Sequence, residues 1–590
     1  MSERPRWQVF GMLILAAAPL AVTLAGFFRP AILRPLFGYG AYYIMLGMVS
    51  LWAICIIRCA RAEGFTFRPF LQRHYPLLIL AGLLTASIFL TTPIGYKTLN
   101  DEATLLSISQ SFFFERGPWE VTQADWFQGN YIPLTRLVPL RPLLFPFFVH
   151  IVHQLGGYHY INAFVLNAVV MFVFLGGVGI VCRRWTRPAT AMAAIVLAAT
   201  QPLVAVYGTG GGYDLMATAF FALSLALLYD FMTAPRRFKM ALLWMTFILM
   251  ANVRHESILY AAIMGLGMLF HIKKDWIKRH AWLLAGTPLM LGPYLWQRIL
   301  VQGRYENPAG TSVFSLNALG TNAQRLLTQF LNLDFYLPYA GFLNLLGLVV
   351  FIVLVAQVLR RRIALTTDTR RFAIVALACL AANLTIILAH HAGQYDHPAQ
   401  ARLFMIFSVA LALMPILLKI IFPQLLRGRV ILTLALMLFL VHHPSAMTPR
   451  YISSLMEIRS NFESRKFLAT LEADNPLVVA PWPVQFTSLG YSARTFKTAN
   501  TRAGELRSAL AHGYFDDLIV FQQKAAKGKR PLNGQRLAPE YDLLPVSAHP
   551  IVADKIYLQI SRHRTAEPAR SQLTDTVHGA DHEQPQGGGN

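Results

Sequence analysis

The feature that most constrains this chain is a series of apolar runs, most of them close to the length that crosses a lipid bilayer as a helix. Thirteen such runs follow one another, from Val9–Phe28 to Val430–His442. A run of about 20 apolar residues spans the hydrocarbon core of a bilayer. Only 14% of the residues are charged, against about a quarter in ordinary soluble proteins. The sequence therefore predicts an α-helical polytopic membrane protein with about 13 transmembrane helices.

The formal net charge of +23 is concentrated in particular loops. Every second loop between apolar runs carries several arginines or lysines, as in 58–73, 183–187 and 419–429. Basic residues of this kind hold loops on the cytoplasmic side of a membrane. The alternation predicts a multi-pass protein of the cell inner (plasma) membrane, with a cytoplasmic N-terminus and a periplasmic or otherwise extracytoplasmic C-terminus. It also speaks against nucleic acid as a partner.

Composition divides the chain into three parts. Residues 1–443 are predicted to form the membrane domain, with large outer loops at 94–142 and 302–338. Residues 444–563 are predicted to form a small soluble α/β extracytoplasmic domain, because "PLVVAPWP", "DDLIVF" and "IYLQI" are typical of buried strands and helical stretches lie between them. Residues 564–590 have almost no apolar side chains to bury and are predicted to be disordered.

An acidic pair, Asp101 and Glu102, directly follows the apolar run that ends at Thr92. In "LNDEATLL", Asn100 is predicted to cap a helix whose first turn holds both carboxylates, where the helix dipole favours them. Helix capping alone is the simpler interpretation. The functional interpretation is a general base held at the membrane surface, and the two are compatible.

Four more charged residues stand at the outer ends of apolar runs: Arg141, Asp214, Arg254 and Arg402. Charge is costly at such positions and is therefore informative about function. Each residue also has a structural interpretation. Asp214 could cap a helix after "GTGGG", Arg254 could pair with Glu256, and Arg402 could extend its own stem to the lipid headgroups.

Several short motifs resemble, in order, those of the GT-C membrane glycosyltransferases, in particular the protein O-mannosyltransferases and the lipid A aminoarabinose transferase. They are the acidic pair after a span, "LRPLLFPFF" followed by "LGG", "YGTGGGYDLMATAFFALSLALL", "ANVRHES" and "AQARLFMIF". The family often has Lys-Pro-Pro where this chain has Arg141-Pro142-Leu143. The resemblance extends from about Pro76 to Leu418 and implies a GT-C-like fold.

The resemblance implies an inverting glycosyltransferase that moves a sugar from a polyprenyl-phosphate donor to an acceptor hydroxyl of a lipid, glycan or protein at the outer face of the membrane. Such chemistry needs a carboxylate that takes the acceptor proton, and fixed positive charge near the leaving phosphate. Asp101 is the expected base, Glu102 is the competing candidate, and Asp214 would orient the acceptor or share the base role. The expected ligands of the donor phosphate are Arg141, Arg254 and Arg402.

No cofactor is expected from the sequence. The outer residues His390, His391, Asp396 and His397 offer metal-ligand chemistry, but their spacing fits no strong motif. The four cysteines form no paired spacing either. The glycines of "GTGGGYD" lack the lysine and hydroxyl of a phosphate-binding loop, which argues against ATP.

A transporter or flippase of a lipid-linked glycan is the alternative function, because it also needs many spans and charges within the membrane. Transporters usually contain internal repeats and place charges near the bilayer midplane, whereas the charges here gather at one face. A ligase that moves a whole glycan from polyprenyl diphosphate is a third interpretation. The sugar, the acceptor and the role of the C-terminal domain stay open.

Overall fold

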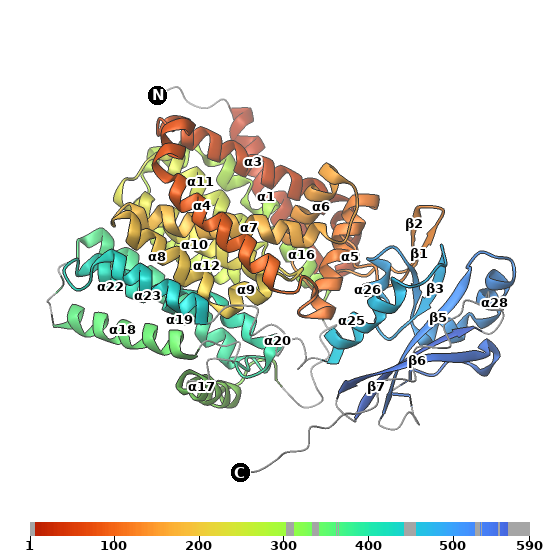
Figure 1. Ribbon diagram of the computed structural model, residues 1–590. Helices are drawn as coiled ribbons and strands as arrows, with labels where there is room; N and C mark the ends of the chain where they lie inside the picture. The colour runs from red at the N-terminus through yellow and green to blue at the C-terminus, as the bar shows by residue number, and fades with distance from the viewer. Residues whose placement is uncertain are drawn as a thin grey trace, which may run out of the picture. The chain divides into compact units, whose positions relative to one another are not determined.

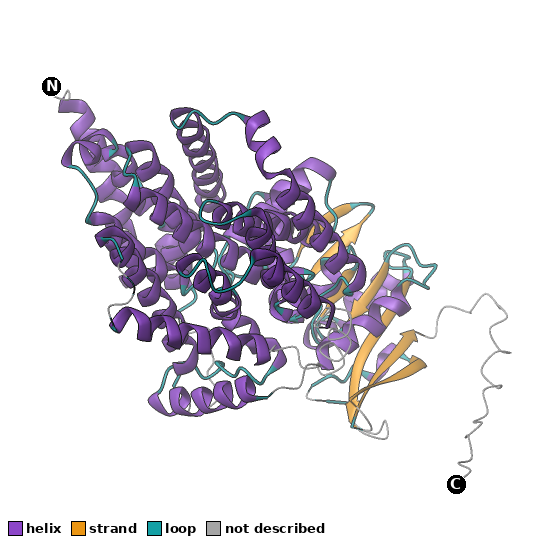
Figure 2. Ribbon diagram, turned by 60° about the vertical axis from the view of Figure 1, so that its left-hand side comes forward, coloured by secondary structure: helices purple, strands orange, loops and turns teal. Residues whose placement is uncertain are grey.

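The computed structural model describes residues 6–302, 312–332, 341–360, 363, 365–441, 456–525, 531–532, 534–552 and 555–563. The chain forms two compact units, one of residues 1–469 and 482–493 and one of residues 470–481 and 494–590. The first unit is mainly helical, and the second contains most of the strands (Figures 1 and 2). The predicted domain boundary at 443/444 and the predicted tail at 564–590 lie outside the described residues.

Among the residues that the structure describes, eight helices of the first unit are long and apolar enough to cross a membrane. The count becomes nine if the bent pair α8 (Pro188–Thr200) and α9 (Pro202–Gly208), which turns by 65°, is counted as one span. The eight are α1 (Arg6–Phe28), the composite Pro30–Ala62 that ends in α3 (Ala41–Ala62), α4 (Phe67–Thr91), α7 (Asn162–Arg183), α10 (Asp214–Thr233), α18 (Gly341–Leu359), α19 (Thr367–Ala389), and the composite Ala399–Ile421 with α21 (Met405–Ala412) and α22 (Met414–Ile421). The chain is therefore an α-helical multi-pass membrane protein.

The predicted count of thirteen spans is not confirmed among the described residues, because several apolar runs form shorter helices. These are α11 (Arg237–Ala251), α12 (Ser257–Leu269) and α23 (Gly428–Val441). α6 (Leu144–Gly156) is a further short apolar helix, outside the thirteen predicted runs. The run 281–301 is divided into α14 (Ala281–Ala285), α15 (Thr287–Met290) and α16 (Gly292–Leu300). Pro288 and Pro293 lie in the first turns of α15 and α16, where a missing backbone N–H is tolerated.

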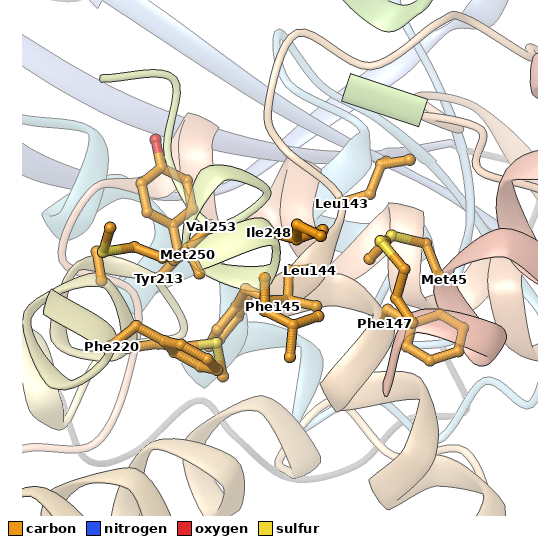
Figure 3. Packing of buried hydrophobic residues seen from close by; sticks show 14 of the residues in the cluster. Met45, Leu143, Leu144, Phe145, Phe147, Tyr213, Phe220, Ile248, Met250 and Val253 are labelled. Carbon is orange, nitrogen blue, oxygen red and sulfur yellow. The ribbon is translucent and has the colours of Figure 1, made fainter. Parts of the chain in front are cut away.

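Two clusters of buried apolar side chains stabilise the first unit. One joins α3, α5 (Leu99–Glu115), α6, α10, α11 and α12, and the other joins α4, α7, α8 and α9 to helices from α17 (Leu316–Leu331) to α23. In Figure 3, Leu144 and Phe145 lie beside Ile248, and Tyr213 lies close to Val253. Tyr213 directly precedes Asp214, and Val253 directly precedes Arg254. The first cluster therefore fixes the backbone on which these charged residues stand.

A separate group of charged residues lies at the ends of several spans, at the end of α10 that is far from Asp214. Lys239 Nζ lies 2.8 Å from Asp230 Oδ2 and 3.9 Å from Glu63 Oε2, and Arg184 Nη1 lies 3.1 Å from Asp230 Oδ1. Asp214 and Asp230 lie at the two ends of α10, about 24 Å apart along the axis. The basic loops and Asp214 are therefore at opposite ends of this span.

The large loop at 94–142 contains a hairpin of β1 (Ala124–Phe127) and β2 (Asn130–Pro133). Ala124 also pairs with Ala493 of β4 (Ser492–Arg494). The first unit includes α25 (Met456–Leu468) and α26 (Val484–Thr487), which follow residue 443 in the chain. Thr487 O accepts hydrogen bonds from Trp126 Nε1 at 3.0 Å and Gln110 Nε2 at 3.2 Å, and these bonds tie α26 to the loop and to α5.

The second unit is a small α/β fold. β3 (Pro476–Val479) and β5 (Asp517–Ala525) are parallel, and β5, β7 (Ile556–His563) and β6 (Leu543–Val552) pair antiparallel in that order. The helices of this unit are α27 (Phe496–Thr501) and α28 (Ala503–Ala511). The strands predicted in "PLVVAPWP", "DDLIVF" and "IYLQI" are confirmed as β3, β5 and β7. Alternating residues of β3 and β5 are buried in one small core, and Leu558 and Ile560 of β7 are also buried.

Candidate active site

The acidic pair lies in the first turn of α5, which follows the span α4 after a short connection. The N-cap of α5 is Thr98, so the expected cap at Asn100 is wrong. Glu102 takes over the capping role, because its Oε2 accepts the backbone N–H of Thr98 at 3.2 Å and that of Lys97. Neighbouring side chains on a helix point about 100° apart. Asp101 therefore faces a different environment from Glu102.

Asp101 lies between two arginines. Its Oδ1 accepts hydrogen bonds from Arg141 Nε, at 2.9 Å, and from Arg141 Nη2. Its Oδ2 accepts a hydrogen bond from Arg402 Nη2. Arg402 Nη1 also donates to Thr98 Oγ1 at 2.8 Å. Two guanidinium groups from distant parts of the chain therefore hold one carboxylate at the start of α5.

Asp214, the first residue of α10, joins this group through two arginines. Arg254 Nη1 donates to Asp214 Oδ1 at 3.0 Å, and Arg402 Nη1 lies 3.6 Å from Asp214 Oδ2. Arg254 Nε lies 2.7 Å from Glu256 Oε1. The pairing of Arg254 with Glu256, which is the structural interpretation of this arginine, is present, and the same guanidinium also holds Asp214.

Backbone contacts position the segments that carry Arg141 and Arg254. His255 Nε2 is hydrogen-bonded to Leu140 O at 2.9 Å, and Leu144 N–H donates to Asn252 O at 3.2 Å. Gln297 of α16, which is fully buried, donates to Pro139 O at 2.8 Å and to the backbone oxygen of the arginine at 141. The connection between α11 and α12 and the segment before α6 are therefore held as one piece.

These residues make up an ion group of three guanidinium groups and three carboxylates, with a formal charge of zero. The members are Arg141, Arg254, Arg402, Asp101, Asp214 and Glu256. Pairing of this kind is what makes buried charge tolerable. The side chain of Asp214 is 2% exposed and that of Arg254 6%, whereas Asp101 and Arg402 are 13% exposed and Arg141 29%. Glu256 is 17% exposed. Asp101, Arg141 and Arg402, which are joined by direct ion pairs, are together called the accessible edge of the ion group.

The two neighbouring carboxyl groups differ in pKa. Burial alone would raise the pKa of Asp101, but the charges of Arg141 and Arg402 and their hydrogen bonds outweigh burial and hold this pKa well below its usual range. Burial raises the pKa of the Glu102 carboxyl and lowers the pKa of the nearby Lys97 ammonium. Asp101 is therefore ionised at neutral pH.

Lys97 is a site residue that the sequence interpretation missed. Its side chain is fully buried, and its Nζ donates to Pro93 O. Lysine is seldom completely buried unless it is paired, and the buried carboxyl of Glu102 lies beside it. A signal was present in the sequence, because Lys97 is a lone cation between an apolar run and the acidic pair.

Five of the six predicted site residues meet in the ion group, and the sixth, Glu102, lies next to the group and contacts backbone amides. The histidine-rich turn is not part of the ion group, although His390 is close enough to Glu256 for the two to interact electrostatically. The rings of His390 and His391 are tilted by 30° with centroids 4.4 Å apart, and Arg325 Nη1 lies 3.5 Å from Asp396 Oδ1. Within the described ranges, no three or more His, Cys, Asp or Glu side chains gather closely enough to hold a metal ion.

Comparisons with known proteins return matches only among solved structures. No protein-family model and no curated protein matches the chain. ArnT from Cupriavidus metallidurans bound to undecaprenyl phosphate is 13% identical over 84% of this chain and 98% of that chain, with a TM-score of 0.44. The apo oligosaccharyltransferase of Archaeoglobus fulgidus is 11% identical over 77% and 69%, with a TM-score of 0.41. The arabinofuranosyltransferase AftD from Mycobacteria is 14% identical over 82% and 40%, with a TM-score of 0.39.

These three structures are GT-C glycosyltransferases, the class that the sequence resembles. Their TM-scores are all below 0.5. The likeness therefore assigns no substrate, donor or residue role to this chain.

Proposed function

We propose that this chain is an inverting glycosyltransferase that moves a sugar from a polyprenyl-phosphate donor to an acceptor hydroxyl of a lipid, glycan or protein. One observation carries the proposal: the Asp101 carboxylate is held between Arg141 and Arg402 at the ends of several membrane spans. A carboxylate and guanidinium groups at one accessible edge supply the proton acceptor and the fixed positive charge that this transfer needs.

The donor phosphate is proposed to bind at the accessible edge of the ion group. Guanidinium groups bind phosphate through two parallel N–H bonds. Arg402 Nε is buried and has no hydrogen-bond partner in the described part of the chain. Because the ion group is already neutral, an arriving phosphate competes with Asp101 for the same N–H groups. A guanidinium that turns from Asp101 to phosphate leaves the carboxylate with a higher pKa and makes it a better proton acceptor.

In the proposed reaction, the acceptor oxygen attacks the anomeric carbon of the sugar. The bond between that carbon and the phosphate oxygen breaks, and polyprenyl phosphate leaves with the electron pair. The acceptor proton passes to Asp101, and a single displacement inverts the anomeric centre. Asp101 is preferred as the base because its side chain is 13% exposed, whereas Glu102 as a whole residue is only 1% exposed and the Asp214 side chain 2%. Asp214 then holds Arg254 and Arg402 in position.

The proposed location is the outer face of the inner (plasma) membrane, with a cytoplasmic N-terminus and an extracytoplasmic C-terminus. Its support is the charge distribution along α10. The ion group contains Asp214 at one end of α10, and the basic residues around Asp230 gather at the other end. Basic ends favour the cytoplasm. The proposed partners are the lipid-linked donor, the acceptor and the surrounding membrane lipids, and no nucleic acid or cofactor is included.

Purified protein in proteoliposomes tests the proposal. A panel of undecaprenyl-phosphate-linked sugars is supplied only to the leaflet that faces the ion group, with envelope lipids as acceptors, and the release of undecaprenyl phosphate is measured. Asp101→Asn is expected to lower the release by about 10²–10⁴-fold, the usual contribution of a general base. Its binding of undecaprenyl phosphate, measured in lipid nanodiscs, should persist.

The matched control is Asp396→Asn, the same substitution at a carboxylate that is 37% exposed. It is expected to keep the turnover of the unaltered chain. Movement of intact donor across the bilayer without release of undecaprenyl phosphate would support the transporter instead. Near-normal release by Asp101→Asn would remove Asp101 from the mechanism.

A further inference from the structure

We infer that Glu102 is a positioning residue, which together with Asn167 clamps a glycine loop (Gly208–Gly212) and thereby sets the separation of Asp101 and Asp214. The effect of the clamp on turnover rests on the proposed function. The clamp itself rests on contacts that involve neither donor nor acceptor.

Glu102 binds two parts of the chain with its two oxygens. Oε2 accepts the backbone N–H groups of Lys97 and Thr98 at the start of α5, as described above. Oε1 accepts the backbone N–H of Gly211 at 3.1 Å. The residue is 1% exposed. Both oxygens are therefore occupied by backbone amides, and neither reaches an acceptor hydroxyl.

Asn167 of α7 holds the same loop from the other side. Its Nδ2 donates to Gly210 O at 2.7 Å and to Gly212 O at 2.9 Å, and the residue is fully buried. A polar side chain inside a membrane span is stable only when it has partners. In this loop, the Gly211 N–H group is therefore bound by Glu102, and two carbonyl groups are bound by Asn167.

The loop needs glycine because these side chains lie so close to its backbone. A Cβ atom at Gly210 would meet Glu102 Oε1 and would lie 3.0 Å from Lys97 Cγ. A Cβ atom at Gly212 would lie 3.4 Å from both Glu102 Oε1 and Asp214 Oδ2. Neither glycine has a positive φ. The contacts at Gly212 are ordinary ones, so a requirement for space, and not for a left-handed backbone, applies at Gly210.

The clamp links the two carboxylates of the ion group. Asp101 immediately precedes Glu102 on α5, and Asp214 follows the glycine loop after Tyr213. Arg402 bridges both carboxylates, and its Nη1 lies 3.6 Å from Asp214 Oδ2. A displacement of about 1 Å at a reacting centre lowers turnover by about 100-fold. A residue that fixes this separation therefore affects turnover without touching substrate.

The test uses three variants of the full chain: Glu102→Gln, Asn167→Ala and the control Asn322→Ala. Glu102→Gln keeps the shape of the side chain but directs an NH₂ group at one set of backbone N–H donors. Asn322 is a close match for Asn167, because it is 3% exposed and its Nδ2 also donates to two backbone carbonyls, Leu388 O at 2.9 Å and His390 O at 3.0 Å.

The first measurement is hydrogen–deuterium exchange of the peptide that covers 205–216, which needs no enzyme activity. Glu102→Gln should speed this exchange by about tenfold, the factor expected when one buried hydrogen bond is lost. Asn167→Ala removes two hydrogen bonds and should speed it by at least about tenfold. Asn322→Ala should leave it unchanged. Exchange at 205–216 equal to that of the unaltered chain in both clamp variants would overturn the inference.

The second measurement is the release of undecaprenyl phosphate as a function of pH. Both clamp variants should lower the maximal turnover by about 100-fold, and KM for the donor should stay within a few-fold of its original value. The acid limb of the pH profile, which is the fall in turnover at low pH, should not move. Loss of that limb in Glu102→Gln would show that Glu102 is the proton acceptor and would overturn the inference. Faster exchange in a chain that transfers no sugar would leave the clamp standing and refute the proposed function.

Discussion

Arg402 joins the two carboxylates of the ion group, and replacing it with glutamine gives the most direct test of that arrangement. The variant loses two charge-assisted hydrogen bonds, one to Asp101 and one to Thr98, and each such bond contributes about 1.5–3 kcal/mol. The side chain is 13% exposed, so solvent screens these contacts little. Asp101 keeps Arg141, and Asp214 keeps Arg254. We expect Arg402→Gln to lower the free energy of unfolding by about 3 kcal/mol.

The same variant removes positive charge from the proposed leaving phosphate. Loss of one such group usually lowers turnover by about 10²–10³-fold. The assays are thermal unfolding in lipid nanodiscs and the release of undecaprenyl phosphate by proteoliposomes that contain equal amounts of protein. Arg136→Gln is the matched control, because Arg136 is 49% exposed and pairs with Glu115 at the surface, where an ion pair contributes less than about 1 kcal/mol. The reasoning is refuted if both variants behave alike.

The pH dependence of this variant follows from the depressed pKa of Asp101. In the unaltered chain, the pairing of Asp101 contributes stability above the unfolded-state pKa of about 3.9 and loses it as the pH falls through the lower folded-state pKa. Arg402→Gln brings the folded-state pKa closer to the unfolded value. The difference in melting temperature between the two proteins should therefore be full at pH 7 and should narrow below about pH 4. An equal difference at pH 7 and pH 3 would contradict this assignment.

Two further predictions concern other parts of the first unit. A methyl group at Gly210 would meet the Glu102 carboxylate, whereas at Gly211 it would make ordinary contacts at 3.5 Å or more. Gly210→Ala should therefore turn over at least about tenfold more slowly than Gly211→Ala. Equal rates of undecaprenyl phosphate release by the two variants would contradict this prediction. Lys239 is 9% exposed between two carboxylates, so Lys239→Met should lower the free energy of unfolding by about 3 kcal/mol. Arg236 is 58% exposed, so Arg236→Gln should lower the free energy of unfolding by less than about 1 kcal/mol. Equal melting temperatures of the Lys239→Met and Arg236→Gln variants would count against the buried pairing of Lys239.

The membrane character of the chain and several residues of the candidate site could be predicted from sequence for one physical reason. Moving a charged side chain from water into lipid costs so much free energy that the length of each apolar run and the position of each charge are informative without a structure. Arg141, Arg254 and Arg402 stood out because they interrupt the ends of apolar runs. The structure brings all three to Asp101 or Asp214.

Other features depended on packing and could not be read from local pattern. The apolar content of 281–301 suits one span, but its prolines and glycines divide it into three short helices. Asp101 and Glu102 are adjacent and chemically alike, and only the orientation of α5 gives one to the arginines and the other to backbone amides. In the sequence, Asn167 is not distinguished from other polar residues within apolar runs. Its two carbonyl partners come from a distant loop and are known only from the structure.

The sequence by itself determined that this chain lies in a membrane, which stretches of it are apolar, and which ionisable side chains stand at the ends of those stretches. Those properties follow from the transfer of individual side chains between water and hydrocarbon, which needs no knowledge of neighbours. Tertiary structure alone decided which charges meet, which of two adjacent carboxyl groups is ionised beside arginine, and which glycines must have no side chain. Those properties depend on distances of a few ångströms between residues that are far apart in the chain, and such distances are fixed only when the helices pack together.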